Sequence, residues 1–151
     1  SNLSMEIAIL GLGCFWGPEI KFSKLDGVIK TEVGYCGGHN AQTNYKEVCS
    51  GKTNHAEVVK LDFDPEVISY EKVLEYFFEI HDPTTLNSQG PDFGTQYRSE
   101  IFYLNNQQKI TAEKLIEKKN IKLSGKVVTK VSLVKNYCPA EEYHQRYLEK
   151  R

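Results

Sequence analysis

The sequence lacks long hydrophobic runs and an excess of charge of either sign. Its apolar stretches, such as residues 7–10, are far shorter than the ~20 residues that span a bilayer, so no transmembrane helix is predicted. Lys and Arg number 19 against 20 Asp and Glu, which gives a net charge of -1. A chain this close to neutral has no strong electrostatic attraction to nucleic acid or anionic lipid. We therefore expect neither a nucleic-acid partner nor a membrane partner.

The N-terminal residues also lack the basic and apolar pattern of a signal peptide. We interpret residues 1–4 as a cloning remnant, and Met5 as the native start. The chain has four cysteines: Cys14, Cys36, Cys49 and Cys138. Without an export signal, such cysteines are more often reduced, catalytic or metal-binding than joined in a disulfide framework. The sequence therefore predicts one domain over residues 5–151, monomeric and cytoplasmic.

Hydrophobic patterns predict strands interleaved with helices. Strands are expected over residues 6–12, 28–35, 56–63, 98–104 and 127–134. Helices are expected from Pro18 to Leu25, after a cap at Ser69 as far as His81, over 107–119, and from Pro139 through Tyr147. A glycine- and asparagine-rich loop precedes residue 56, and an exposed loop covers 87–96. This order predicts an α+β fold, a two-layer α/β sandwich with helices packed against a mixed sheet.

The first two strands are joined by a helix, as in a crossover connection between parallel strands. If they run the same way, both strands finish at the same end of the sheet, and Cys14 and Cys36 follow them there. The third strand would begin at that end with Glu57. The sequence therefore predicts that one sheet edge gathers the reactive residue types.

Cys14 lies where a strand passes through a glycine turn into a helix. Backbone N–H groups and the positive helix end can stabilise a thiolate there, which favours a nucleophilic cysteine over a small buried one. Phe15 and Trp16 follow directly, and they either wall an apolar pocket or belong to the core.

Four other residues are candidates for polar roles near this turn. Glu57 follows His55-Ala56 at the start of a strand, where apolar neighbours would raise its pKa and suit it to donate a proton. The ordinary alternative is a solvated glutamate. Asp92, Tyr45 and Tyr97 lie in or beside turns, where polar residues are common, so each is a weak signal by itself.

A zinc site is an alternative for the central cysteines. Cys36, His39, Cys49 and His55 are residue types that bind zinc. The spacing from Cys49 to His55 is wider than usual, and the neighbouring glycines explain the loop without an ion. We therefore expect no metal.

Taken in order, the motifs resemble those of one family, the peptide methionine sulfoxide reductases of the A type. The resemblance is carried by Gly13-Cys14-Phe15-Trp16-Gly17, Gly34-Tyr35-Cys36-Gly37-Gly38, Tyr45-Lys46-Glu47-Val48-Cys49-Ser50-Gly51, His55-Ala56-Glu57, His81-Asp82-Pro83-Thr84, Gln89-Gly90-Pro91-Asp92, Gly94-Thr95-Gln96-Tyr97-Arg98-Ser99 and Ala140-Glu141-Glu142-Tyr143-His144-Gln145. It runs nearly from Met5 to Leu148.

The resemblance implies a ferredoxin-like sandwich and a single catalytic domain that reduces the S epimer of methionine sulfoxide, free or in proteins. It implies that Cys14 attacks sulfur and becomes a sulfenic acid, while Phe15 and Trp16 hold the S-methyl group. The proton donors to the sulfoxide oxygen would be Glu57, Tyr45 and Tyr97, with Asp92 in the same polar cluster. It implies no cofactor, and thioredoxin or a small thiol as reductant.

The sequence departs from this family's pattern at three places. Many members carry resolving cysteines in a glycine-rich C-terminal tail, whereas this sequence ends at Arg151. We expect Cys36 to resolve the sulfenic acid, with Cys138 as its rival and Cys49 as the weakest choice.

Asn54 and Ser88 stand where Gly and Arg are usual, and we expect them to alter only the local loops. A non-catalytic or zinc-stabilised module that binds oxidised methionine is the competing hypothesis. Such a module has no need of a thiol beside the pocket and a proton donor opposite it.

Overall fold

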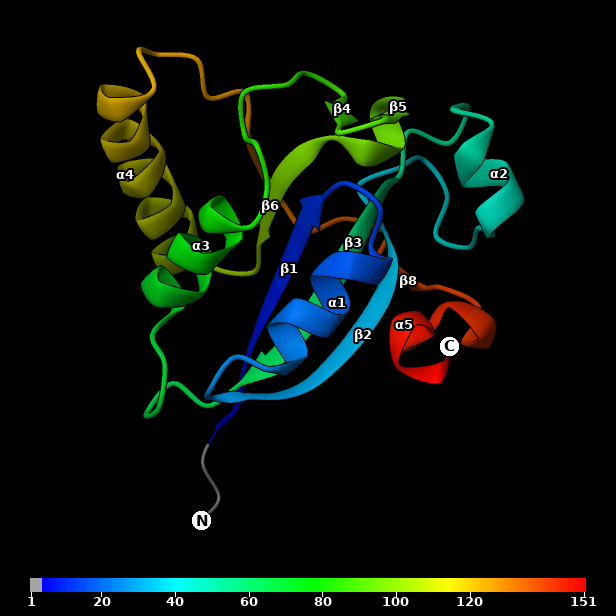
Figure 1. Cartoon of the computed structure of the whole chain (residues 1–151), viewed down its shortest axis with the longest axis horizontal. Helices are drawn as coiled ribbons and strands as arrows, with labels where there is room; N and C mark the ends of the chain where they lie inside the picture. Colours follow the sequence, from blue (N-terminus) through cyan, green and yellow to red (C-terminus); the bar gives the residue numbers. More distant parts are fainter. Residues whose placement is uncertain (1–3) are drawn as a thin grey trace.

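The computed structural model describes residues 4–151, in which a six-stranded sheet is covered by helices (Figure 1). Of the residues interpreted as a cloning remnant, Ser1 to Leu3 lie outside the described part. The elements in chain order are β1 (Glu6–Leu12), α1 (Trp16–Ser23), β2 (Val28–Cys36), α2 (Tyr45–Cys49), β3 (Ala56–Phe63), α3 (Tyr70–Glu79), β4 (Ser88–Gln89), β5 (Asp92–Phe93), β6 (Ser99–Tyr103), α4 (Asn106–Lys122), β7 (Lys130–Leu133), β8 (Cys138–Pro139) and α5 (Tyr147–Lys150). Short 3₁₀ turns cover Thr95–Tyr97 and Glu142–His144.

The strand order in the main sheet is β7-β6-β1-β3-β2-β8. β6 and β7 pair in parallel, while the other neighbours are antiparallel, so the sheet is mixed as predicted. Because β3 lies between β1 and β2 and runs against both, β1 and β2 point the same way. Their carboxyl ends therefore meet the start of β3 at one end of the sheet, as predicted, but Cys36 lies on the sheet face opposite the helices.

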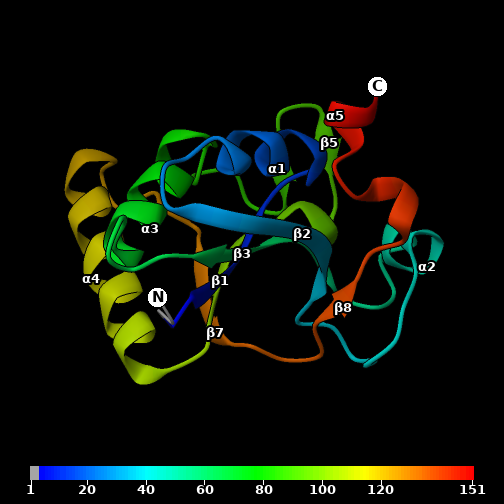
Figure 2. The same ribbon diagram turned by 90° about the horizontal axis from the view of Figure 1, so that it is seen from below.

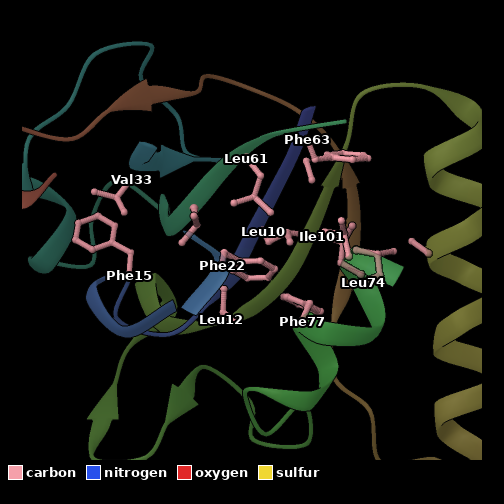
Figure 3. Packing of buried hydrophobic residues seen from close by; sticks show 14 of the residues in the cluster. Leu10, Leu12, Phe15, Phe22, Val33, Leu61, Phe63, Leu74, Phe77 and Ile101 are labelled. Atoms are coloured by element: carbon pink, nitrogen blue, oxygen red, sulfur yellow. The ribbon is translucent and has the colours of Figure 1, made fainter. Parts of the chain in front are cut away.

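The helices lie on one face of the sheet, and most of the core is there. Figure 2 shows α1 and α3 on one side of the strands and the chain between β7 and β8 on the other. Leu10, Phe22, Leu61, Phe77 and Ile101 are fully buried in the helix-side core (Figure 3). Burying each of these side chains stabilises the fold by roughly 1.5–3 kcal/mol.

Side chains alternate between the two faces along each strand. Val58 belongs to a smaller cluster on the other face, with Ile9 and Cys36, whereas its neighbour Val59 belongs to the helix-side core. By the same alternation, Glu57 lies on the helix side, as does Phe15 in the turn after β1.

The cap expected at Ser69 is present. The Ser69 hydroxyl accepts a hydrogen bond from the Lys72 amide at 3.1 Å, and α3 buries Val73, Leu74 and Phe77 as its pattern predicts. None of the helices within residues 4–151 is both long enough and apolar enough to cross a bilayer.

Three sequence-based expectations were wrong. α1 begins at Trp16, so Pro18 is its third residue rather than its first. No helix starts at Pro139, which instead pairs with Gly34 in the edge strand β8, a place that suits a residue without an N–H donor. The expected loop before β3 contains the short helix α2, which is too short for hydrophobic periodicity to reveal.

Candidate active site

The turn after β1 is held in place by a neighbouring hairpin. Gly13 has a φ of 99°, and a Cβ atom there would lie 2.8 Å from the Cβ of Gln89. Only glycine accommodates both that backbone conformation and that close approach. Gln89 pairs with Asp92 in the β4–β5 hairpin, so this contact fixes the hairpin against the turn that carries Cys14.

The Cys14 thiol is half-buried at the N-terminus of α1. Burial raises its pKa to about 11, and the nearby carboxylates of Glu57 and Asp92 add to the rise. A hydrogen bond from the Trp16 backbone acts in the opposite direction, as the sequence pattern suggested, but burial outweighs it. The thiol is therefore protonated at neutral pH before substrate binds.

Glu57 is 1% exposed and lies beside Tyr35 in the register of β2 and β3. One carboxyl oxygen accepts a hydrogen bond from the backbone N–H of Phe15 at 3.2 Å. Burial raises the pKa of Glu57 to about 8, against the lowering effect of that bond, and the charge of Asp92 contributes. A buried acid next to the thiol is therefore largely protonated at neutral pH.

The tyrosines named from the sequence lie in this same environment. Burial raises the pKa of Tyr97 to about 12, with Glu57 as the next cause and Cys14 among the contributors. The pKa of Tyr45 is also raised, first by burial, and the Glu57 charge adds to it. Both hydroxyls are therefore protonated and lie near the acid, and Tyr97 also lies near the Cys14 thiol.

The two aromatic residues after Cys14 differ in burial. Phe15 is 1% exposed, and its ring lies 5.8 Å from that of Tyr35 and 5.2 Å from that of His144. Trp16 is only half-buried, and its indole N–H donates to Nδ1 of His144 at 3.0 Å. The indole also stacks on Tyr147, with the ring centres 3.8 Å apart and the planes at 11°. An apolar surface with a fixed indole thus lies beside the thiol.

Sequence reasoning assigned no role to His144 or Tyr147. Because Nδ1 of His144 accepts the indole hydrogen bond, the ring is neutral and carries its proton on Nε2. Burial lowers the pKa of His144, which favours this form. The signal for His144 was the stretch Ala140–Gln145, which matched a family motif but whose individual residues were not interpreted, while Tyr147 lies beyond that motif.

Glu141 is another site residue that the sequence did not reveal. Its carboxylate accepts hydrogen bonds from the Tyr35 hydroxyl and from the Tyr45 backbone N–H, both at 2.8 Å. These bonds fix the start of α2 against β2, and α2 carries the Tyr45 side chain. The ring of Tyr45 then lies 4.5 Å from that of His144.

The other three cysteines occupy different environments. Cys36 is the last residue of β2 rather than a loop residue, is fully buried, and belongs to the cluster on the sheet face opposite Phe15. Cys138 is also buried, and its thiol faces the carbonyl oxygen of Thr43. Cys49 is exposed on α2, and its charge is among the causes that raise the pKa of Cys14.

The zinc alternative has no support in the part of the chain that the structure describes. Between residues 4 and 151, no three His, Cys, Asp or Glu side chains are grouped to hold a metal ion. His55 uses both ring nitrogens for the backbone, with Nδ1 accepting from Gly38 N and Nε2 lying 2.8 Å from the carbonyl of Asn40. Its ring is therefore committed to holding the loop.

Asn54, which stands where glycine is usual, has a φ of 60°. Glycine and asparagine both tolerate this left-handed conformation, so the exchange preserves the turn. The carbonyl of Asn54 accepts a hydrogen bond from Arg98 at 2.9 Å, and Arg98 also pairs with Glu100 at 2.6 Å. The loop before Glu57 is thereby anchored to β6. Ser88 pairs with Phe93 in the β4–β5 hairpin, and nothing in the structure explains serine in place of the usual arginine.

Comparison with known proteins decides the family. The family model described as peptide methionine sulfoxide reductase matches residues 6–151. The chain belongs to this family. It is 80% identical over 147 residues to a peptide methionine sulfoxide reductase MsrA of Pelagibacter ubique, with 97% of this chain and 100% of that protein covered. It is 49% identical over 146 residues to an MsrA of Methanococcus maripaludis, covering 97% and 93% of the two chains.

Solved structures of methionine sulfoxide reductases share the fold. Mxr1 from Saccharomyces cerevisiae in reduced form superposes with a TM-score of 0.93 at 40% identity, covering 97% of this chain and 86% of that one. The methionine sulfoxide reductase A of Corynebacterium diphtheriae gives a TM-score of 0.93 at 36% identity, with coverages of 97% and 75%. The α+β fold predicted from the sequence is therefore the fold of the family.

Proposed function

We propose that the protein reduces the S epimer of methionine sulfoxide, with Cys14 as the nucleophile and Glu57 as the proton donor. The observation that carries the proposal is the buried Glu57 carboxyl, which has a pKa of about 8 and lies next to the residue that follows the thiol. A sulfoxide oxygen leaves sulfur readily only once it is protonated. A neutral acid close to a thiol supplies both the proton for the oxygen and the nucleophile for the sulfur in one site.

In this scheme the substrate's S-methyl group lies against Phe15 and Trp16. Phe15 is fixed in the core, and the indole of Trp16 is held on both its edge and its face, by His144 and Tyr147. Apolar contact of this kind orients the sulfoxide so that its sulfur faces the Cys14 thiol. The hydroxyls of Tyr45 and Tyr97 are the additional donors to the oxygen.

The reaction balances without a cofactor. Sulfur of Cys14 attacks the sulfoxide sulfur, Glu57 protonates the oxygen, and the thiol proton passes to Glu57. The oxygen then moves as hydroxyl to the Cys14 sulfur, the substrate S–O bond and the new S–S bond break, and methionine departs, which leaves Cys14 as a sulfenic acid. The substrate sulfur is reduced by two electrons, and the cysteine sulfur is oxidised by two.

Recycling requires a thiol that condenses with the sulfenic acid, releasing water and forming a disulfide. We propose Cys36 for this role, with Cys138 as its rival, although both are buried and a bridge needs Cα atoms within roughly 7 Å. The end of β2 must therefore open for Cys36 to react, and Cys138 must leave its buried position beside Thr43. A structure of yeast Mxr1 in complex with Trx2 is similar to this chain, with a TM-score of 0.68 at 26% identity, which supports thioredoxin as the reductant. A small thiol is the alternative.

We also propose that the reaction takes place in the cytoplasm, because four cysteines in a chain of this size are more often reduced or catalytic than joined in a disulfide framework.

Stoichiometric assays with the separate sulfoxide epimers test the proposal. We expect one methionine per enzyme from the S epimer without reductant, and almost none from the R epimer. Cys14→Ser should abolish the reaction because an alkoxide is not accessible near neutral pH. Equal reduction of both epimers, or substantial turnover by Cys14→Ser, would overturn the assignment. Binding of the sulfoxide without any reduction would indicate the non-catalytic module instead.

A further inference from the structure

Glu19 is a buried carboxylate that the proposed chemistry does not use. It lies on α1 three residues after Trp16 and is only 2% exposed. One oxygen accepts a hydrogen bond from the Thr31 hydroxyl at 2.7 Å, and the other accepts from the backbone N–H of Arg146 at 2.8 Å. A buried carboxylate is costly unless such bonds satisfy it, so its position is tightly determined.

The Arg146 bond joins α1 to a strained point of the C-terminal segment. Arg146 has φ 50° and ψ 42°, the left-handed conformation, immediately before α5. For a residue other than glycine this conformation is unfavourable and persists only where other contacts maintain it. The Glu19 bond to the Arg146 N–H is such a contact, because it holds the backbone at that residue.

The next residue along the chain is Tyr147, whose ring stacks on Trp16. These contacts form a closed circuit. Trp16 and Glu19 are on one helix, Glu19 binds the backbone of Arg146, and Arg146 precedes the tyrosine that stacks on Trp16. On the other side of Arg146, the amide of Gln145 bonds to the backbone of Val33 in β2. The C-terminal segment is thus held at two successive residues. Gln145 is bound by Val33, and Arg146 is bound by Glu19.

We propose that Glu19 is a positioning residue that sets the orientation of the Trp16 indole, through Arg146 and Tyr147. Its effect on substrate binding rests on the proposed function, in which Trp16 holds the S-methyl group. Its effect on the orientation of the indole does not depend on that function, because this circuit of contacts is present in the free protein. Glu19 thereby links the helix that carries the catalytic turn to the segment that completes the substrate pocket.

The chain contains a single tryptophan, so its fluorescence reports on Trp16 alone. In Glu19→Ala we expect the emission to shift to longer wavelength, because the indole loses its fixed stacking partner and meets water. We expect KM for methionine S-sulfoxide to rise about three- to tenfold, with kcat changed less than twofold, since the thiol and Glu57 are untouched. Glu19→Gln should restore both, because its amide oxygen can accept from Arg146 while its NH₂ group donates to Thr31.

Thr31→Val is the matched control. It removes the other hydrogen bond of the same buried carboxylate but leaves the bond to Arg146. We expect it to lower thermal stability while keeping wild-type fluorescence and KM. If Glu19→Ala does not fold, Glu19→Leu with Thr31→Val replaces the buried polar pair by apolar side chains and still leaves the Arg146 N–H without its acceptor.

A double-mutant cycle with Tyr147→Ala tests the route. If Glu19 acts through the stacked ring, Glu19→Ala should change neither emission nor KM further once Tyr147 is removed. Lower thermal stability with unchanged emission and KM in Glu19→Ala, or effects that simply add to those of Tyr147→Ala, would overturn the proposal. Failure of the wild-type protein to reduce the sulfoxide would overturn the proposed function, and the emission measurements would still decide the role of Glu19.

Discussion

The backbone N–H of Phe15 donates to a carboxyl oxygen of Glu57 at 3.2 Å, which ties the acid to the residue that follows Cys14. The same Phe15 ring is buried against Tyr35 and His144. One residue therefore links the proposed nucleophile to the proposed acid through its backbone, and its side chain belongs to the pocket proposed for the substrate.

This relationship gives a prediction for Glu57→Gln. The amide keeps the shape and can still accept from Phe15, but it cannot deliver a proton. We expect the chemical step at neutral pH to slow by about 10²–10⁴-fold, the usual effect of removing a general acid. Single-turnover kinetics measure that step directly, and an unchanged rate would remove Glu57 from the mechanism.

The wild-type pH profile provides a second readout for the same residue. Because the pKa of Glu57 is raised to about 8, the carboxyl is protonated below that pH and ionised above it. The single-turnover rate should therefore fall as the pH rises above about 8. The residual single-turnover rate of Glu57→Gln should not fall as the pH rises above about 8.

A second prediction concerns the indole in the pocket. Trp16→Ala removes the apolar surface proposed for the methyl group, so KM should rise and saturating substrate should recover part of the rate. Trp16→Phe is the control, because it keeps an aromatic surface while losing the hydrogen bond to His144. We expect it to lie between the wild type and Trp16→Ala. A KM unchanged in Trp16→Ala would place the methyl group elsewhere.

Patterns that depend on local chemistry could be predicted from the sequence, while those that depend on tertiary contacts could not. The alternation in β3 and the Ser69 cap predicted their elements because each signal lies within the element itself. Pro139 was misinterpreted because proline suits both a helix start and an edge strand, and only the pairing with β2 distinguishes them.

The same distinction applies to the site. The glycine turn indicated Cys14, but its raised pKa depends on burial that no local pattern reports. His144 and Tyr147 reach Trp16 from the far end of the chain, so their role appears only in the fold. Cys36 is different, because its position follows from a local rule. Successive side chains of a strand lie on opposite faces of the sheet, so Cys36 had to lie on the face opposite to Tyr35.

A third prediction concerns stability in acid. His81 lies between the carbonyl of Phe77, at 2.6 Å, and the hydroxyl of Ser99, at 2.8 Å. Burial lowers its pKa to about 4, below the ordinary value of 6.5. The unfolded chain therefore binds a proton at a higher pH than the folded one, so stability is lost as the pH falls from about 6.5 to 4. A shift of this size corresponds to roughly 3 kcal/mol.

Denaturant unfolding between pH 7 and pH 4 measures this effect. His81→Gln should reduce the pH dependence while lowering stability at pH 7, because the residue no longer titrates but its hydrogen bonds are altered. His39→Gln is the control, since His39 is exposed and should leave the slope unchanged. Equal slopes in the wild type and His81→Gln would show that other groups control acid stability.

The last prediction concerns which cysteine resolves the sulfenic acid of Cys14. If Cys36 does so, Cys36→Ser should release one methionine per enzyme and then stop, accumulating the sulfenic acid in the presence of thioredoxin. The burial of Cys36 on the far face adds a condition: the disulfide must form slowly, after β2 has opened, so its rate should rise with mild denaturant. Disulfide mapping after one turnover would identify the bridge.

Cys138→Ser and Cys49→Ser complete the test. Cys138 must also leave its buried position beside Thr43, whereas Cys49 is exposed and already affects the Cys14 thiol. If Cys36→Ser turns over normally while one of the other two variants stops after a single methionine, that cysteine is the resolving residue. If all three variants turn over normally, no single one of these thiols is required. Because a bridge to a buried residue would need the strand to open first, a disulfide that forms at the same rate with and without denaturant would argue for exposed Cys49.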